Sequence, residues 1–317
     1  MIRILIPLDG SSAAEEALDH AFSIARAFPA ELTLLRVITE SDNGASVRTD
    51  SVDLALWRHQ AKAYLDGLQA KHASRKIPIR CEIAEGNPAE IVVQFMVRMK
   101  PDLLVMTRYG LGNAQDFATG GTAQKIISSA NCSVLLLDPA RPIVGDLSYH
   151  CILVSVDEGK DCDCAVAIAA MIAEIHAASL ILLQVIEEPR LPDGLPATLR
   201  ARQLVNELRQ ILRDEAERRL CELAAKMPKH LHVETRVLVS AETSLAIESA
   251  AEDYNSDLLV LHAQPDGRNA VCRRSPVNQS LIQYSHRPLF IVQSSAAEGL
   301  ASNFRSVYID EQHREAG

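Results

Sequence analysis

The first candidate for ligand binding is a glycine-rich stretch, TRYGLGNAQDFATGG, from Thr107 to Gly121. It follows the apolar run Asp102–Met106. Glycine reaches positive φ at little cost and allows close approach, so successive backbone amides can turn towards phosphate oxygens. A helix that starts near Thr122 would add its positive N-terminal end, and Arg108 is a candidate for neutralising phosphate charge. The stretch matches neither the P-loop nor the G-x-G-x-x-G pattern, so two interpretations remain open, a phosphate-binding loop and an empty flexible loop.

A second candidate is Asp9, which lies at the end of the first apolar run, followed by Gly10. Open parallel sheets bind ligands beyond the carboxyl ends of their strands. Because a carboxylate repels phosphate, Asp9 suits a ribose or an adenine edge, and the alternative is a hydrogen bond that stabilises the loop. Ser12 and Glu15 have the spacing of a capping box, which predicts that Ser12 caps the following helix.

These residues need strands and helices to position them, and the first half of the chain alternates between the two patterns. Between its apolar runs lie amphipathic stretches, which include Ala13–Ala27, Asp53–His72 and Ala89–Met99. Alternating strands and helices at this spacing predict βαβ units and a parallel sheet with helices on both faces. The apolar runs that predict the strands are Ile2–Leu8, Glu31–Val37, Ile77–Ile83, Asp102–Met106 and Ser133–Asp138.

The second half of the chain repeats this order. Cys151–Asp157 matches Arg3–Asp9 at an offset of 148 residues, and the later strands match at an offset of 155. A longer central helix, expected over Ala197–Met227, accommodates the difference. This duplication predicts two similar α/β domains, at residues 1–142 and 148–294. Residues 295–317 have no counterpart, and we expect either a frayed terminus or a partner-binding segment.

The second copy lacks the features of the first candidate site. The stretch HAQPDGRNAVCRRSP (His262–Pro276) matches the glycine-rich stretch but keeps none of the glycines in place. Proline removes an amide donor at Pro265 and at Pro276. Asp161 and Asp163 add negative charge near Asp157, which opposes phosphate. We therefore expect this domain to have lost nucleotide binding.

Taken together, ILIPLDGSSAAEEAL, EGNPAEIV, and DLLVMTRYG leading to NCSVLLL resemble a universal stress protein domain, and the second half resembles a more divergent copy. The resemblance implies two tandem Rossmann-like domains, each a five-stranded parallel sheet flanked by helices, that pair as an intramolecular pseudo-dimer, with a homodimer as a further option. Some members of the family bind ATP, and Mg²⁺ with it, through the pattern G-x2-G-x9-G-[ST]. When Ser133 is aligned with the proline usual in the family, Gly110 and Gly120 match this pattern, while Thr107 and Gly121 depart from it.

The resemblance also places Asp9 in the adenosine part of the site and the backbone of Val37 against the adenine ring. The predicted nucleotide site consists of residues at the ends of three strands and in the glycine-rich stretch: Pro7, Asp9, Val37, Met106, Thr107, Gly110, Gly120, Gly121 and Thr122.

The composition excludes several classes of function. The net charge of -9 argues against general binding to nucleic acid or to an anionic membrane, and 4% aromatic residues are few for stacking on single strands. The opening MIRILIPLDG has no signal-peptide pattern, and the apolar segment Cys164–Ile186 reads as a helix and a strand rather than a membrane span. Seven cysteines then indicate reduced thiols and a cytoplasmic location.

Two other sets of residues have weak metal-ligand spacing. Cys162 and Cys164 are separated by a single residue. Because the sequence has no second such pair, we interpret Cys164 as a core residue. His230 and His232 alternate on one strand, and we interpret them as surface residues. We found no catalytic motif.

The leading hypothesis from the sequence is therefore a stress-response protein that binds an adenine nucleotide, ATP, in its N-terminal domain. Binding would order the glycine-rich stretch and signal to an unknown protein partner, with little or no hydrolysis. The alternatives are a nucleotide-free scaffold that binds proteins or small molecules, and an enzyme that transfers nucleotide groups.

Overall fold

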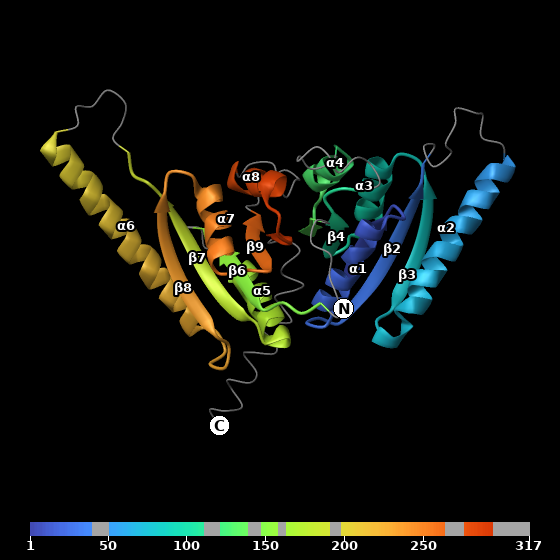
Figure 1. Cartoon of the computed structure of the whole chain (residues 1–317), viewed down its shortest axis with the longest axis horizontal. Coiled ribbons are helices and arrows are strands. Elements are labelled where there is room, and N and C mark those ends of the chain that lie inside the picture. Colours follow the sequence, from blue (N-terminus) through green and yellow to red (C-terminus); the bar gives the residue numbers. More distant parts are fainter. Residues whose placement is uncertain are drawn as a thin grey trace. The chain divides into compact units, whose positions relative to one another are not determined.

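The computed structural model describes residues 1–39, 51–110, 121–138, 147–157, 163–190, 198–263 and 276–293, without the side chains of residues 51–53. The chain divides into two compact units (Figure 1). The first contains the segment up to Ser148 together with α8 and β10, and the second runs from Tyr149 to His262.

The first unit is an alternation of strands and helices. Its elements are β1 (Ile2–Leu8), α1 (Ser12–Ala25), β2 (Ala30–Ile38), α2 (Ser51–Lys71), a short 3-10 helix (Ala73–Arg75), β3 (Ile79–Glu85), α3 (Pro88–Met99), β4 (Leu103–Thr107), α4 (Gly121–Ser129), β5 (Ser133–Leu137), α8 (Pro276–Tyr284) and β10 (Leu289–Gln293).

The sheet of the first unit has the strand order β3-β2-β1-β4-β5, and these five strands are all parallel. β10 pairs antiparallel with β5, with Phe290 opposite Leu135. Every residue of β4 and of β5 is buried, so helices cover both faces of the sheet, as parallel strands require. The predicted α/β fold with a parallel sheet is confirmed.

The second unit repeats the pattern with a sheet of four parallel strands in the order β9-β6-β7-β8. The strand that the sequence predicts as the fifth of this copy is β10, which lies beside β5. The elements of the second unit are β6 (Cys151–Ser155), α5 (Asp163–His176), β7 (Ser179–Glu187), α6 (Leu199–Ala225), β8 (Val233–Ser240), α7 (Thr243–Asp253) and β9 (Leu258–Ala263).

The helices α3 and α6 each begin with a side-chain cap. The side chain of Asn87 accepts hydrogen bonds from the first amides of α3, with Pro88 in the first turn and Gly86 at a φ of +132° before it. Thr198 caps α6 by accepting from the amide of Ala201 at 3.2 Å. The capped helix, Leu199–Ala225, falls within the range expected from the sequence.

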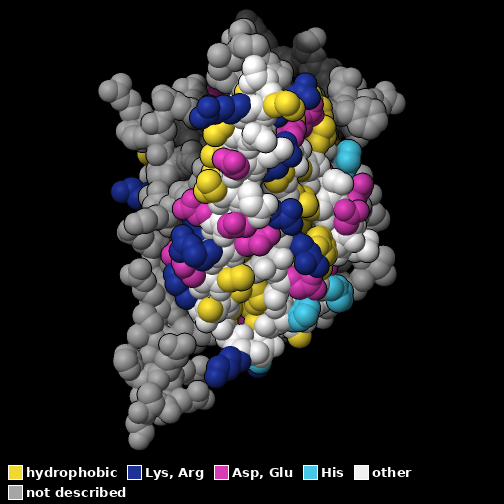
Figure 2. All heavy atoms as spheres, turned by 90° about the vertical axis from the view of Figure 1, so that its left-hand side faces the viewer, with side chains coloured by type: hydrophobic (Ala, Val, Ile, Leu, Met, Phe, Trp, Pro, Cys, Tyr) yellow, Lys and Arg dark blue, Asp and Glu magenta, His cyan; other side chains and the backbone are white. Residues whose placement is uncertain are grey.

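α6 packs against β7 and β8, and its buried residues, Ala216, Leu220 and Leu223, lie in its C-terminal half. Its outer face mixes both signs of charge with hydrophobic side chains (Figure 2). Arg213 and Arg218 each pair with a glutamate one turn further on, which gives modest support to an exposed helix. Among the described residues, no helix is long and apolar enough to cross a membrane.

Candidate functional site

Asp9 and Gly110 meet at the carboxyl edge of the first sheet, one just beyond β1 and the other beyond β4. The chain builds β2 and β3 on one side of β1, then places β4 and β5 on the other side, so the strand order reverses between β1 and β4. Ligands of open α/β sheets bind in the crevice at such a reversal. A Cβ on Gly110 would overlap the carboxylate oxygen Oδ2 of Asp9 and lie 3.2 Å from its Cγ. Glycine therefore allows this close approach.

The carboxylate of Asp9 is held by Ser11, whose amide and hydroxyl both donate to Oδ1, at 2.9 and 2.6 Å. The same hydroxyl oxygen accepts from the amide of Ala14 at 3.0 Å, so Ser11 is the N-cap of α1. The prediction that Ser12 is the cap is wrong by one residue. The hydroxyl of Ser11 donates to Asp9 while its oxygen accepts from Ala14, and Ser12 is the first helical residue.

Arg36 reaches along the carboxyl edge of the sheet beside the predicted adenine contact. Val37 is buried, and its carbonyl accepts a hydrogen bond from Nη1 of Arg36 at 3.3 Å. Gly10 has a φ of +88°, and Nη2 of Arg36 lies 3.8 Å from the position that a Cβ on Gly10 would take. Pro7 is half-buried in β1. The site therefore has a cation that the sequence motifs did not single out.

The end of β4 supplies buried residues to the site. Met106 and Thr107 are both buried, and the hydroxyl of Thr107 donates to the carbonyl of Tyr109 at 2.8 Å. Arg108 is only 1% exposed, and its amide donates to the carbonyl of Leu137 at 2.8 Å. The role of Arg108 in neutralising phosphate charge stays a prediction from the sequence.

The N-terminal end of α4 follows on the same side of the sheet. α4 begins at Gly121, next to the predicted start at Thr122, and both residues are exposed. Nothing lies within 4 Å of the position that a Cβ on Gly121 would take. The predicted contact Gly120 lies outside the described residues.

Tyr64 on α2 is a further residue near this edge that sequence reasoning missed. Burial raises the pKa of its hydroxyl, and the neighbouring carboxylates of Glu15 and Asp9 raise it further, while the cation of Arg36 lowers it. Tyr64 on α2 is therefore within electrostatic range of Asp9, Glu15 and Arg36. Arg36 could have been found from its place beside Val37, but nothing in the sequence around Tyr64 points to the site.

In the second unit, the matching strand ends carry different residues. Ser155 replaces Pro7 and is buried, Asp157 matches Asp9 and is half-buried, and His262 on β9 is 3% exposed. Pro276 begins α8, and residues 158–162 and 264–275 lie outside the described part of the chain. The loss of nucleotide binding there stays a prediction from the sequence.

The two histidines with alternate spacing contact separate carboxylates. Nε2 of His230 lies 2.9 Å from Oε1 of Glu174, and Nε2 of His232 lies 3.3 Å from Oε1 of Glu234. Within the described ranges, no group of three or more His, Cys, Asp or Glu side chains could hold a metal ion. Cys164 is half-buried on α5, and Cys162 is outside these ranges.

The strand order that reverses between β1 and β4, with parallel strands joined by helices, defines a Rossmann-like α/β protein. The sequence model of the universal stress protein family matches residues 1–138 and, a second time, residues 148–293. The chain belongs to the universal stress protein family and carries its domain twice.

Individual relatives agree with this assignment. A universal stress protein of Methanocaldococcus jannaschii is 31% identical over 137 residues, which cover 43% of this chain and 81% of the relative. The crystal structure of a universal stress protein from Archaeoglobus fulgidus DSM 4304 matches with a TM-score of 0.60 and 15% identity, over 92% of this chain and 98% of that one. A functionally unknown protein from Pseudomonas aeruginosa PAO1 matches with a TM-score of 0.65 and 15% identity, over 96% and 98%. At these identities, the solved structures show the fold alone.

Proposed function

We propose that the first domain binds an adenine nucleotide, ATP with Mg²⁺, at the carboxyl edge between β1 and β4. The observation that carries the proposal is the contact of Asp9 with Gly110 at the point where the strand order reverses. Two segments about a hundred residues apart in the chain meet there, and glycine leaves the backbone open to a ligand.

The residues at this edge fit the two ends of a nucleotide. Ser11 holds Asp9 through Oδ1, and the carboxylate of Asp9 would accept a hydrogen bond from the ribose or the adenine. The exposed start of α4 at Gly121 and Thr122 suits phosphate, because the first amides of a helix lack partners within the helix.

We further propose that the nucleotide acts as a signal rather than as a substrate. Asp9, the carboxylate at this edge, accepts a hydrogen bond from Ser11. It borders the side of the site that suits ribose or adenine, so it is not placed to act as a base at the phosphate. Binding would change the surface that this edge of the sheet presents to an unknown protein partner. This proposal includes a cytoplasmic location, where ATP is available, and pairing of the two repeats as a pseudo-dimer.

Calorimetric titration of the full chain with MgATP tests the proposal. We expect saturable binding that Asp9→Ala weakens at least about tenfold, as expected for the loss of a hydrogen bond to a charged group. Asp157→Ala, at the matching position of the second domain, is the matched control and should leave affinity unchanged. No heat and no thermal stabilisation at millimolar MgATP would contradict the proposal and favour the nucleotide-free scaffold. Phosphate release well above that of the Asp9→Ala variant would favour an enzyme.

A further inference from the structure

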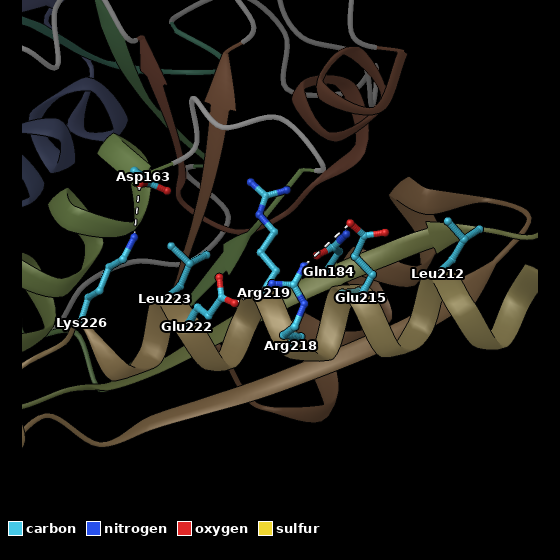
Figure 3. Close-up of a pocket in the computed structure, with 10 residues that line it drawn as sticks. Asp163, Gln184, Leu212, Glu215, Arg218, Arg219, Glu222, Leu223 and Lys226 are labelled. Carbon is cyan, nitrogen blue, oxygen red and sulfur yellow. Dashed lines mark hydrogen bonds and ion pairs between the residues drawn. The ribbon is translucent and has the colours of Figure 1, made fainter.

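A cavity of about 540 Å³ lies in the second unit, between α6, β7 and the start of α5. Figure 3 shows side chains of α6 along one wall, with Gln184 reaching the cavity from β7 and Asp163 from α5. This volume is typical of small-molecule sites, which span about 300–1,000 Å³. The cavity is formed by the second unit alone, so it does not depend on nucleotide binding in the first.

The positions around this cavity correspond to positions around Tyr64 in the first repeat. An offset of 155 residues places buried Ala61 and Leu65 of α2 on buried Ala216 and Leu220 of α6. The same offset places Tyr64 on Arg219. For the residues before this helix, the offset of 148 aligns Glu15 with Asp163 and Arg36 with Gln184.

The second repeat therefore has different functional groups at these two positions. An arginine on the second strand and a tyrosine on the following helix have become a glutamine and an arginine. The result is a neutral amide beneath α6 and a cation on α6 itself. The two repeats therefore present different groups to a ligand at the same place in the fold.

Gln184 is the clearest sign of a ligand. Its side chain is 4% exposed, and its oxygen Oε1 has no hydrogen-bond partner among the described residues. A buried acceptor without a partner is costly, since it has left water and gained nothing in return. A hydroxyl or an amine of a ligand in the cavity would supply the missing donor.

The rest of the inner wall is apolar with a single cation. Leu212, Ala216 and Leu223 supply the apolar surface, and Arg219, half-buried, is the charged residue among them. Figure 3 shows the Arg219 side chain extending away from the α6 backbone. A guanidinium has five N–H donors, so it can bind an acid in addition to the contacts that it makes within the protein.

The charged residues at the rim are exposed and offset one another. Lys226 lies 3.8 Å from Asp163, with side chains more than 60% exposed. Arg218 pairs with Glu222 at 2.6 Å and lies 4.0 Å from Glu215. The rim therefore carries three carboxylates and two cations, all exposed, so an acid in the cavity depends on the half-buried Arg219 for a charged partner.

We propose that this cavity binds a small organic acid that has an apolar body and a hydroxyl or amino group. The hydroxyl or amino group donates to Oε1 of Gln184, and the acid group binds Arg219. The apolar body packs against Leu212, Ala216 and Leu223.

Titration of the full chain with three matched compounds tests this proposal. The probe is 3-hydroxybenzoate, which has all three features; benzoate lacks the donor, and 3-hydroxybenzyl alcohol lacks the acid. We expect the probe to bind at least about tenfold more tightly than either analogue, since each lost contact removes a hydrogen bond to a buried or charged group. Absence of binding at millimolar probe, or equal affinity for all three, would overturn the proposal.

Variants separate this cavity from other surfaces. Gln184→Leu and Arg219→Gln should each weaken binding of 3-hydroxybenzoate at least about tenfold. Arg213→Gln is the control, because Arg213 lies on the same helix, exposed and paired with Glu217 away from the cavity. Unchanged affinity in Gln184→Leu, or an equal loss in Arg213→Gln, would contradict the assignment.

Thermal unfolding without the probe gives a second readout. Because Gln184→Leu removes a buried acceptor that has no described partner, we expect a higher unfolding midpoint together with weaker binding. That combination is typical of a residue kept for a ligand. A lower midpoint would show that the amide supports the fold and would overturn its assignment as a ligand contact.

Discussion

At the scale of single residues, the candidate nucleotide site depends on how closely side chains approach the backbone. Gly110 touches the carboxylate of Asp9, whereas Gly121 has open space where a Cβ would lie. Both glycines belong to the glycine-rich stretch that the sequence analysis singled out, yet their structural roles differ. Gly110 permits a contact between two segments, and Gly121 begins a helix.

Replacing these two glycines by alanine should separate the roles. Gly110→Ala forces the new methyl group into Asp9, and we expect the free energy of unfolding to fall by about 1–3 kcal/mol. Gly121→Ala adds a better helix former in open space and should change stability by less than about 1 kcal/mol, in the stabilising direction. Urea denaturation followed by circular dichroism measures both. Equal effects of the two substitutions would show that the contact with Asp9 does not constrain the loop.

At the scale of elements, the start of α1 links local structure to the site. Ser11 caps the helix through its hydroxyl oxygen and uses the proton of the same hydroxyl to hold Asp9. One side chain therefore stabilises the helix end and orients the carboxylate of Asp9 at the carboxyl edge of the sheet. The neighbouring Ser12 is exposed at the first helical position.

Alanine substitution of the two serines tests this assignment. Ser11→Ala removes the cap and the bond to Asp9, so we expect a loss of about 1–2 kcal/mol in the free energy of unfolding. Ser12→Ala should change it by no more than about 0.5 kcal/mol, because no cap is lost. Denaturant melts of both variants provide the comparison. A larger loss for Ser12→Ala would restore the capping box expected from the sequence.

At the scale of the whole molecule, the chain contains the same domain twice and treats the two copies differently. The first copy brings Asp9, Gly110 and the start of α4 to one edge of its sheet. The second copy has lengthened its central helix and holds a cavity beneath it, lined by Gln184 and Arg219. The difference lies in the side chains at matching positions, since the strand order around the reversal is shared.

Acid stability is a property of the whole fold to which buried His20 contributes. Burial lowers the pKa of His20 from 6.5 to about 3. Between these values the unfolded chain binds a proton that the folded chain does not, so stability is complete above about pH 6.5 and falls as the pH decreases towards 3. The slope from this one group is at most about 1.4 kcal/mol per pH unit.

The variant His20→Leu should therefore show a flatter dependence of unfolding free energy on pH between about 6.5 and 3. The exposed His59, replaced in His59→Leu, is the control and should keep the slope of the parent chain. Denaturant titrations at a series of pH values measure the slope. The prediction concerns the slope rather than the absolute stability, and an unchanged slope in His20→Leu would contradict it.

Local patterns in the sequence were sufficient for the α/β fold, the duplication and the long helix α6. Alternating apolar runs and amphipathic stretches predict these features, because burial of one face is a property of neighbouring residues. The turn at Gly86 and the start of α3 follow from the local preferences of glycine and proline. The offset between the repeats also aligns Gln184 with Arg36, although the sequence offered no reason to single out either residue.

The tertiary structure alone decided which of these residues meet. Asp9 and Gly110 are brought together by the return of the chain across β1, and Arg108 is buried by packing that its neighbours in sequence do not reveal. Ser11 rather than Ser12 caps α1, and its hydroxyl also donates a hydrogen bond to Asp9. The unsatisfied oxygen of Gln184 and the cavity beside it exist only once α6 covers β7. In each case the deciding interaction depends on distance and burial, which the order of residues along the chain does not contain.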